Sequence, residues 1–352
     1  MKRRVLVFLS ALALLVLVPA VALANHVPHF DFETPLFGLA AAPDGSLLVA
    51  DTGAGIVELR HGEGSMVAFI PGVTDVDPIG RSSMFAITGG GDDPTAGKVF
   101  RVSRGSQREL ADLKAYEEAH NPDGGEIDSN PFDVAALSGG YALVADAGGN
   151  SLLLVDDEGN IDLVATLPPA LASTANLKAL VGCPTPPPDL AFACGLPEMI
   201  PAEAVATSVA IGPDGAYYVG ELKGFPAPVG ESKVWRIEPG TLNAECGTSP
   251  ACSVVYSDFT SVIDLAFGPD GTLYVVEFEE TTWLAAELYA FHGVPVVLQG
   301  GTISACDAYG GGCSEVLGSV MFPTAVAIDK KGAAYATVGA LIPGAAQVIA
   351  LP

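Results

Sequence analysis

The sequence predicts an all-β chain that folds as a six-bladed β-propeller of four-stranded antiparallel blades. Three observations lead to this prediction. A hairpin-like segment recurs along the 352 residues, the spacing of its copies matches propeller blades, and 41 Gly and 27 Pro residues punctuate many short apolar runs. Frequent Gly and Pro between short strands are typical of β-folds with tight turns.

The repeated segment is a β-hairpin of 15 residues. In each copy an apolar strand leads to a turn that ends in Gly, and a second apolar strand follows. Gly supplies the positive φ that such a turn requires. The copies that align without gaps are Phe37–Asp51, Phe132–Asp146, Thr207–Glu221, Ile263–Glu277 and Thr324–Val338.

The spacing of the turns predicts one further copy and one insertion. Gly45 and Gly140 are 95 residues apart, about two blades of 40–50 residues, so a degenerate unit is expected between them. We assign it to Arg81–Thr88 followed by Lys98–Val102. The 75 residues between the next two turns predict a loop excursion near residues 171–204 that contains Cys183 and Cys194.

Two more candidate strands follow each hairpin, most clearly at Ser151–Val155 and Ile161–Thr166, which gives four strands per unit. The last unit has only a third strand, near Ala346–Leu351. We therefore expect the N-terminal strand, around His26–Phe32, to complete it and close the ring, which leaves no open sheet edge.

The N-terminus has the pattern of a secretory signal peptide. Lys2, Arg3 and Arg4 precede an apolar run that is too short to span a membrane and ends before a small-residue cleavage pattern, Ala22-Leu23-Ala24. We expect residues 1–24 to be a signal peptide and residues 25–352 to be one propeller domain. The predicted location is secreted, extracellular or periplasmic, without a membrane partner after cleavage.

The charge and the cysteines agree with an exported protein. Of 16 basic residues three lie in residues 1–24, so 13 basic and 41 acidic side chains remain, a net charge of −28. This acidity disfavours nucleic acid as a partner. The six cysteines form three sequence-close pairs, and an even count in an exported chain predicts disulfides: Cys183–Cys194, Cys246–Cys252 and Cys306–Cys313.

Three segments resemble the ScyD/ScyE family of exported propeller proteins, which is named for gene clusters that make the pigment scytonemin. They are Asn130–Asn150, Ser208–Pro226 and Val262–Gly271. The resemblance covers most of the chain after Pro35 and implies a six-bladed ring outside the cytoplasm. It brings no catalytic motif that transfers to residues of this sequence.

Acidic residues occupy two positions of the repeat on one face of the ring. Asp51, Asp146, Glu221 and Glu277 end the second strand in four copies, and we interpret them as structural acids that hold the next turn. Asp133 and Asp264 begin the first strand, where Ser208 is their equivalent in another copy. These three residues are the predicted ligand site, and Asp133 and Asp264 are candidate ligands for Ca²⁺.

Two functions follow from this pattern. The first is a non-enzymatic or accessory protein, expected to be a monomer, that binds a small molecule or protein on one propeller face. The alternative is a hydrolase or lyase of the lactonase kind with an axial Ca²⁺, an analogy based on fold alone. A purely adhesive surface protein is a third possibility. The sequence contains no nucleophile elbow or zinc-protease motif.

Overall fold

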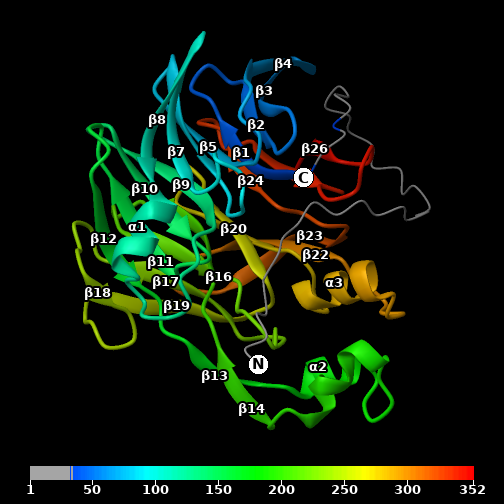
Figure 1. The fold of residues 1–352 in the computed structure, drawn as a ribbon. Coiled ribbons are helices and arrows are strands. Elements are labelled where there is room, and N and C mark those ends of the chain that lie inside the picture. The colour runs from blue at the N-terminus through cyan, green and yellow to red at the C-terminus, as the bar shows by residue number, and fades with distance from the viewer. Residues whose placement is uncertain (1–31, 33–34) are drawn as a thin grey trace.

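The computed structural model describes residue 32 and residues 35–352, which form a ring of six antiparallel sheets (Figure 1). The prediction of a six-bladed β-propeller with mainly four-stranded blades is confirmed. Residues 1–24, the predicted signal peptide, lie outside the described residues.

The strands of each blade follow one another from the axis outward, except where short additional strands intervene. The first three blades are β1 (Leu36–Ala41), β2 (Leu47–Asp51), β3 (Gly55–Arg60) and β4 (Glu63–Ala68); β5 (Val73–Ile79), β6 (Ser83–Thr88), β7 (Lys98–Ser103) and β8 (Ser106–Asp112); and β9 (Pro131–Leu137), β10 (Tyr141–Asp146), β11 (Ser151–Val155) and β12 (Ile161–Thr166).

The last three blades are β15 (Ala206–Ile211), β16 (Tyr217–Glu221), β17 (Ser232–Ile237) and β19 (Cys252–Phe259); β20 (Val262–Phe267), β21 (Leu273–Glu277), β22 (Gly301–Cys306) and β23 (Cys313–Val320); and β24 (Val326–Ile328), β25 (Ala334–Val338) and β26 (Gln347–Ala350). A short strand, β18 (Ala244–Glu245), pairs in parallel with β12 and extends the third blade.

The hairpin turns form as the repeat predicts, because side chain and backbone cooperate in each. Gly45, Gly215 and Gly271 have φ of 91°, 80° and 87°, a region that residues with a Cβ avoid. The Asp before each Gly accepts a hydrogen bond from the backbone N–H two residues further on, as Asp44 does from Ser46 at 3.1 Å. Local chemistry therefore fixes the register of these hairpins.

Neighbouring blades bury apolar side chains between them. Ala50 and Ile56 of the first blade, for example, pack with Ala86 and Val102 of the second, and all four are fully buried. Similar clusters join the other pairs of blades. The core of the protein is therefore a series of layers around the ring rather than one central nucleus.

The second blade corrects one part of the sequence prediction. Arg81–Thr88 and Lys98–Val102 correspond to the second and third strands of this blade, whereas the innermost strand is β5. The assignment was one strand out of step because this unit has no Asp-Gly turn to mark its hairpin. A sixth gap-free copy does exist: Thr74–Thr88 aligns with Phe132–Asp146 over all 15 residues.

The ends of the chain meet at the sixth blade. Phe32 forms an isolated antiparallel bridge with Ala346, just before β26, and Phe32 is 2% exposed. The Leu36 N–H also donates to the Ala340 carbonyl oxygen at 3.0 Å. The remainder of the expected closing strand, residues 26–31, lies outside the described residues.

Two segments outside the blades cover one face of the ring. Residues 170–204 contain the hairpin β13 (Ala170–Ser173) and β14 (Met199–Ala202), helix α2 (Ala175–Leu180) and a 3₁₀-helix (Pro188–Gly195), and α3 (Trp283–His292) follows β21. Figure 1 shows α2 and α3 on the same side of the molecule. We call these two segments the cap. The remaining helix, α1 (Leu113–His120), follows β8.

The three predicted disulfides are present, and the described residues contain no free cysteine. Cys252 and Cys313 each begin the outer strand of a blade, so two of the bonds fasten equivalent places in consecutive blades. In the part of the chain that the structure describes, no helix is long and apolar enough to cross a membrane.

Candidate functional site

Four of the six innermost strands carry a polar side chain at the same level of the axis. Counted from the first blade, the equivalent residues are Gly38, Asp75, Asp133, Ser208, Asp264 and Ala325. Each of the four polar side chains accepts a hydrogen bond from the innermost strand of the next blade. The donors are the N–H groups of Val134 at 3.0 Å, Val209 at 2.6 Å, Leu265 at 2.8 Å and Val326 at 2.7 Å.

The predicted ligand residues Asp133, Ser208 and Asp264 therefore do lie together, and they contact one another. Ser208 Oγ is 2.7 Å from Asp133 Oδ2 and 3.1 Å from Asp264 Oδ1. Asp75 extends the chain, because its carboxyl group hydrogen-bonds that of Asp133. The result is a line of four side chains across the axis, from the second blade to the fifth.

Protons must be shared along this line. Burial, reinforced by the charge of Asp133, raises the pKa values of Asp75 and Asp264 well above their usual range. Burial also raises the pKa of Asp133, but hydrogen bonds from Asp75, Ser208 and the Val209 N–H favour its charged form. All contacts are satisfied when Asp75 and Asp264 are neutral donors and Asp133 holds the negative charge.

A second acid lies two residues further along β5. Asp77 Oδ2 accepts a hydrogen bond from the Ala136 N–H at 2.6 Å, so this contact also joins the second and third blades. Burial is the main cause that raises the pKa of Asp77 to about 7, and the charge of Asp133 contributes. Asp75 and Asp77 were not predicted from the sequence, although the gap-free copy at Thr74–Thr88 places Asp75 at the position of Asp133.

The four aspartates line an axial cavity of about 250 Å³, to which all six innermost strands contribute. Its walls combine carboxyl groups with apolar side chains such as Val76 and Leu265. Toward the hairpin turns, the cavity shares Ala41, Ile211, Phe267 and Ile328 with an outer vestibule of about 550 Å³. Three turn prolines and Lys330 form the vestibule wall, where Pro43, Pro213 and Pro269 lie.

The opposite end of the cavity is covered by the cap. Phe132 and Ile263 begin their innermost strands, are each 4% exposed, and belong to one apolar cluster with the cap residues Leu177 and Trp283. The Phe132 ring also meets that of Phe37 edge-on, with centroids 5.5 Å apart. Among the described residues, the face that carries the hairpin turns, here called the turn face, is therefore the one from which a ligand can reach the axial acids.

The acids that end the second strands have contacts of another kind. Asp51 accepts hydrogen bonds from the Gly53 and Ala54 N–H groups, and Glu277 accepts one from the Thr260 N–H at 2.6 Å. Asp146 accepts bonds from Ser129 Oγ and from three backbone N–H groups. Glu221 pairs with the buried Lys223 and accepts a bond from Trp235 Nε1. These contacts hold the adjoining loops.

The axial acids do not fit a calcium site. Their oxygens contact backbone N–H groups, Ser208 or one another, and none of them is a buried oxygen without a partner. Among the described residues, no three His, Cys, Asp or Glu side chains form a metal-ligand group. Calcium prefers six to eight oxygen ligands, whereas these oxygens already join blade to blade.

Comparison with known proteins gives the fold but no narrower family. No protein-family model matches the chain, and no curated protein matches its sequence. A gluconolactonase from Xanthomonas campestris has 13% identity, coverage of 92% of this chain and 88% of its own, and a TM-score of 0.56. Regucalcin from Agrobacterium tumefaciens, described as a calcium-binding protein, has 13% identity, coverage of 90% and 88%, and a TM-score of 0.52.

A third similar structure is the PQQ-bound aldose sugar dehydrogenase from Streptomyces coelicolor, with 12% identity, coverage of 94% and 97%, and a TM-score of 0.54. The chain is a six-bladed β-propeller. Since identities this low show the fold alone, the activities of these proteins do not transfer to it. The narrower resemblance to the ScyD/ScyE family stays a prediction.

Proposed function

We propose that this chain is an exported, non-enzymatic binding protein that takes a small molecule into its axial cavity from the turn face. The observation that carries the proposal is the line Asp75–Asp133–Ser208–Asp264. It lies at the wall of a cavity that is covered at one end by the cap and joined to a vestibule at the other. The three disulfides and the N-terminal sequence pattern support export.

The chemistry of the cavity favours a neutral ligand that bears hydroxyl groups. The carboxyl oxygens of Asp75, Asp133 and Asp264 have further lone pairs that can accept hydrogen bonds from ligand hydroxyls, and the walls between them are apolar. Pockets that combine apolar walls with a few convergent polar groups are typical of small-molecule sites. The volume of about 250 Å³ limits the buried part of the ligand to roughly the size of a monosaccharide.

Thermal denaturation in the presence of myo-inositol, D-glucose and glucono-1,5-lactone tests this function. At least one of these probes is expected to raise Tm, and Ala41→Trp, which narrows the passage between cavity and vestibule, is expected to remove the effect. Ala333→Trp is the matched control, because Ala333 is exposed in a hairpin turn and lines neither cavity.

Two results would overturn the proposal. If no probe changes Tm in either protein, the ligand class is wrong. If glucono-1,5-lactone is hydrolysed in a reaction that requires Ca²⁺ and is lost in Asp133→Asn, the chain is a metal-assisted hydrolase instead.

A further inference from the structure

A second cluster of acids lies away from the axis, where α1 packs beside the third blade. Glu117 of α1 is 3% exposed, and its Oε1 has no hydrogen-bond partner. Ser151, which begins β11, is 1% exposed, and its Oγ has no partner either. Leaving a buried polar atom unpaired is costly, so two such atoms in one place require an explanation.

Gly149 shows that these side chains converge. A Cβ atom built on this glycine would lie 3.0 Å from Glu117 Oε2, 3.4 Å from Ser151 Oγ and 3.6 Å from the Asp146 carboxyl carbon. Oxygen-bearing groups from α1, β10 and β11 therefore converge beside the backbone of Gly149. Because two of those groups include unpaired oxygens, the structure provides acceptors there without a donor to match them.

The loop after α1 adds further oxygens. Asn121 ends the helix in the left-handed region at φ 40°, and its Nδ2 donates to the Gly125 carbonyl oxygen at 3.0 Å. Its Oδ1 is buried and has no partner. Two residues on, Asp123 accepts hydrogen bonds from the Gly125 N–H and from Asn150 Nδ2, both at 2.8 Å.

The charge around Glu117 is uncompensated. The carboxylates of Asp146, Asp123 and Asp128 lie near it, and no hydrogen-bond donor reaches its Oε1. Glu203 also lies close enough to Asp123 and Asp128 for their negative charges to act on its carboxyl group. Lys114 acts on Asp128, but its ammonium group donates to the Gly91 carbonyl oxygen, so it does not pair with this cluster.

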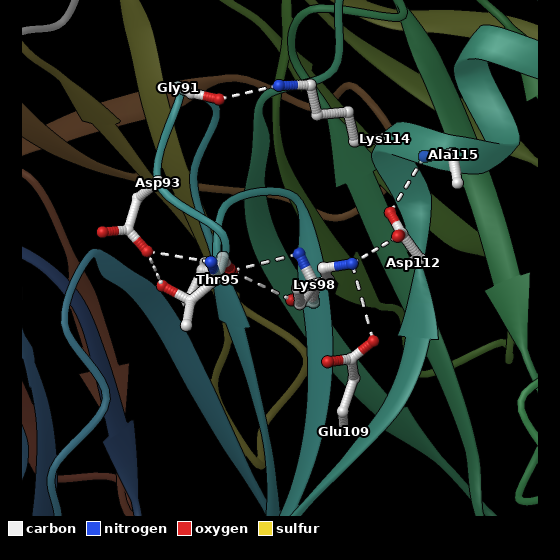
Figure 2. Close-up of polar contacts among 9 residues, drawn as sticks. Gly91, Asp93, Thr95, Lys98, Glu109, Asp112, Lys114 and Ala115 are labelled. Atoms are coloured by element: carbon white, nitrogen blue, oxygen red, sulfur yellow. Dashed lines mark hydrogen bonds and ion pairs between the residues drawn. The ribbon is translucent and has the colours of Figure 1, made fainter.

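The helix that carries Glu117 is firmly anchored, as Figure 2 shows. Asp112 caps α1 by accepting a hydrogen bond from the Ala115 N–H at 2.9 Å, and Lys98 pairs with Asp112. Lys114 ties the first turn to the Gly91 carbonyl oxygen at 2.9 Å. Both contacts fix the first turn of α1 on the second blade, and Glu117 lies one turn further along the helix.

We infer that this cluster is a calcium site formed by Glu117, Asn121, Asp123 and Ser151. It offers carboxylate, amide and hydroxyl oxygens, which suit a hard cation that tolerates irregular geometry. Since no three acids form a ligand group among the described residues, backbone carbonyls and water complete the coordination. The ion connects α1 to the third blade, and through Asn150, which accepts from the Val205 N–H at 2.8 Å, to the end of the cap segment.

Thermal denaturation of the mature chain in EDTA and in CaCl₂ tests this site. With an affinity in the range of extracellular calcium modules, 10 mM CaCl₂ is expected to raise Tm by about 5 °C. Glu117→Gln is expected to weaken Ca²⁺ binding at least tenfold. Glu287→Gln is the control for the loss of a glutamate charge, since Glu287 is a partly buried glutamate on α3, away from this cluster.

A second readout covers a variant that folds poorly. Terbium bound beside Glu117 is expected to luminesce through Tyr116, the neighbouring residue on α1, and Ca²⁺ is expected to displace it. Ser151→Ala should fold as the wild type does and weaken Ca²⁺ binding several-fold. If CaCl₂ leaves Tm of the wild type unchanged, or if Glu117→Gln and Ser151→Ala bind Ca²⁺ as tightly as the wild type, the inference is wrong.

Discussion

The axial acids and the Glu117 cluster are both groups of buried or partly buried carboxyls, but they differ in how their oxygens are used. At the axis, Asp133 accepts hydrogen bonds from Ser208 and the Val209 N–H, and Asp264 accepts one from the Val326 N–H. Beside α1, Glu117 and Ser151 each have a buried oxygen without a partner. The axial group is a closed network, whereas the group beside α1 contains buried oxygens that no hydrogen bond reaches.

This difference shows that the number of carboxylates does not by itself identify a metal site in a propeller. The position on the axis led to the prediction of Ca²⁺ at Asp133 and Asp264, because convergent oxygens suit that ion. Hydrogen bonds between blades use the same oxygens for another purpose. An unpaired oxygen is the more informative sign, since burial without a partner costs free energy that a ligand can recover.

The largest expected effect comes from breaking the closed network. Asp133→Ala is expected to lower the free energy of unfolding by about 3–4 kcal/mol, because it leaves the Val209 N–H, Ser208 and Asp75 without their shared partner. Urea denaturation measures the change. Asp157→Ala, at an exposed turn of the third blade, is the control and should change stability by less than about 0.5 kcal/mol.

A smaller effect, of opposite sign, is expected from Asp77→Asn at pH 8. The pKa of Asp77 rises from an ordinary value of 3.8 to about 7 on folding, so the folded chain binds this proton more tightly than the unfolded chain does. The stabilisation that comes from this bound proton of Asp77 is complete below about pH 4 and is lost as the pH rises through about 7.

Asp77→Asn keeps an oxygen for the Ala136 N–H and removes the charge, so it should stabilise the protein by about 2 kcal/mol at pH 8 and very little at pH 4. Urea denaturation across this pH range measures the difference. An equal effect at both pH values would show that Asp77 does not titrate as described.

The smallest expected effect distinguishes Glu117 from Asp146, a neighbouring acid whose oxygens are paired. In EDTA at pH 8, Glu117→Gln is expected to stabilise the protein by about 1 kcal/mol, because it removes a buried charge that has three acidic neighbours and no cation. Asp146→Asn, which disturbs a carboxylate with four hydrogen-bond donors, should destabilise it. Destabilisation by both variants would mean that the two acids are satisfied alike.

The fold could be predicted from the sequence because its signals are local and repeated. Asp44, Gly45 and their equivalents fix each hairpin within a few residues, and the repetition of the unit indicates the ring. The second blade was placed one strand late because its turn, Gly80-Arg81-Ser82, lacks the final Gly that ends the other five turns. That shift removed β5, and with it Asp75 and Asp77, from the predicted site.

The candidate site was harder to predict, because its chemistry depends on contacts between blades. Sequence reasoning selected Asp133, Ser208 and Asp264, which the fold does bring together. It could not show that N–H groups 57–76 residues away occupy their oxygens. The Glu117 cluster gave no signal, since Glu117, Asn121 and Ser151 belong to no repeated motif and meet only through the packing of α1.

The most direct test of the contrast between the two clusters is an anomalous difference map from crystals of the mature protein soaked in terbium chloride. We expect a peak among Glu117, Asn121, Asp123 and Ser151, beside α1, and none on the propeller axis. A peak bound by Asp133 and Asp264, with the α1 cluster empty, would contradict this expectation.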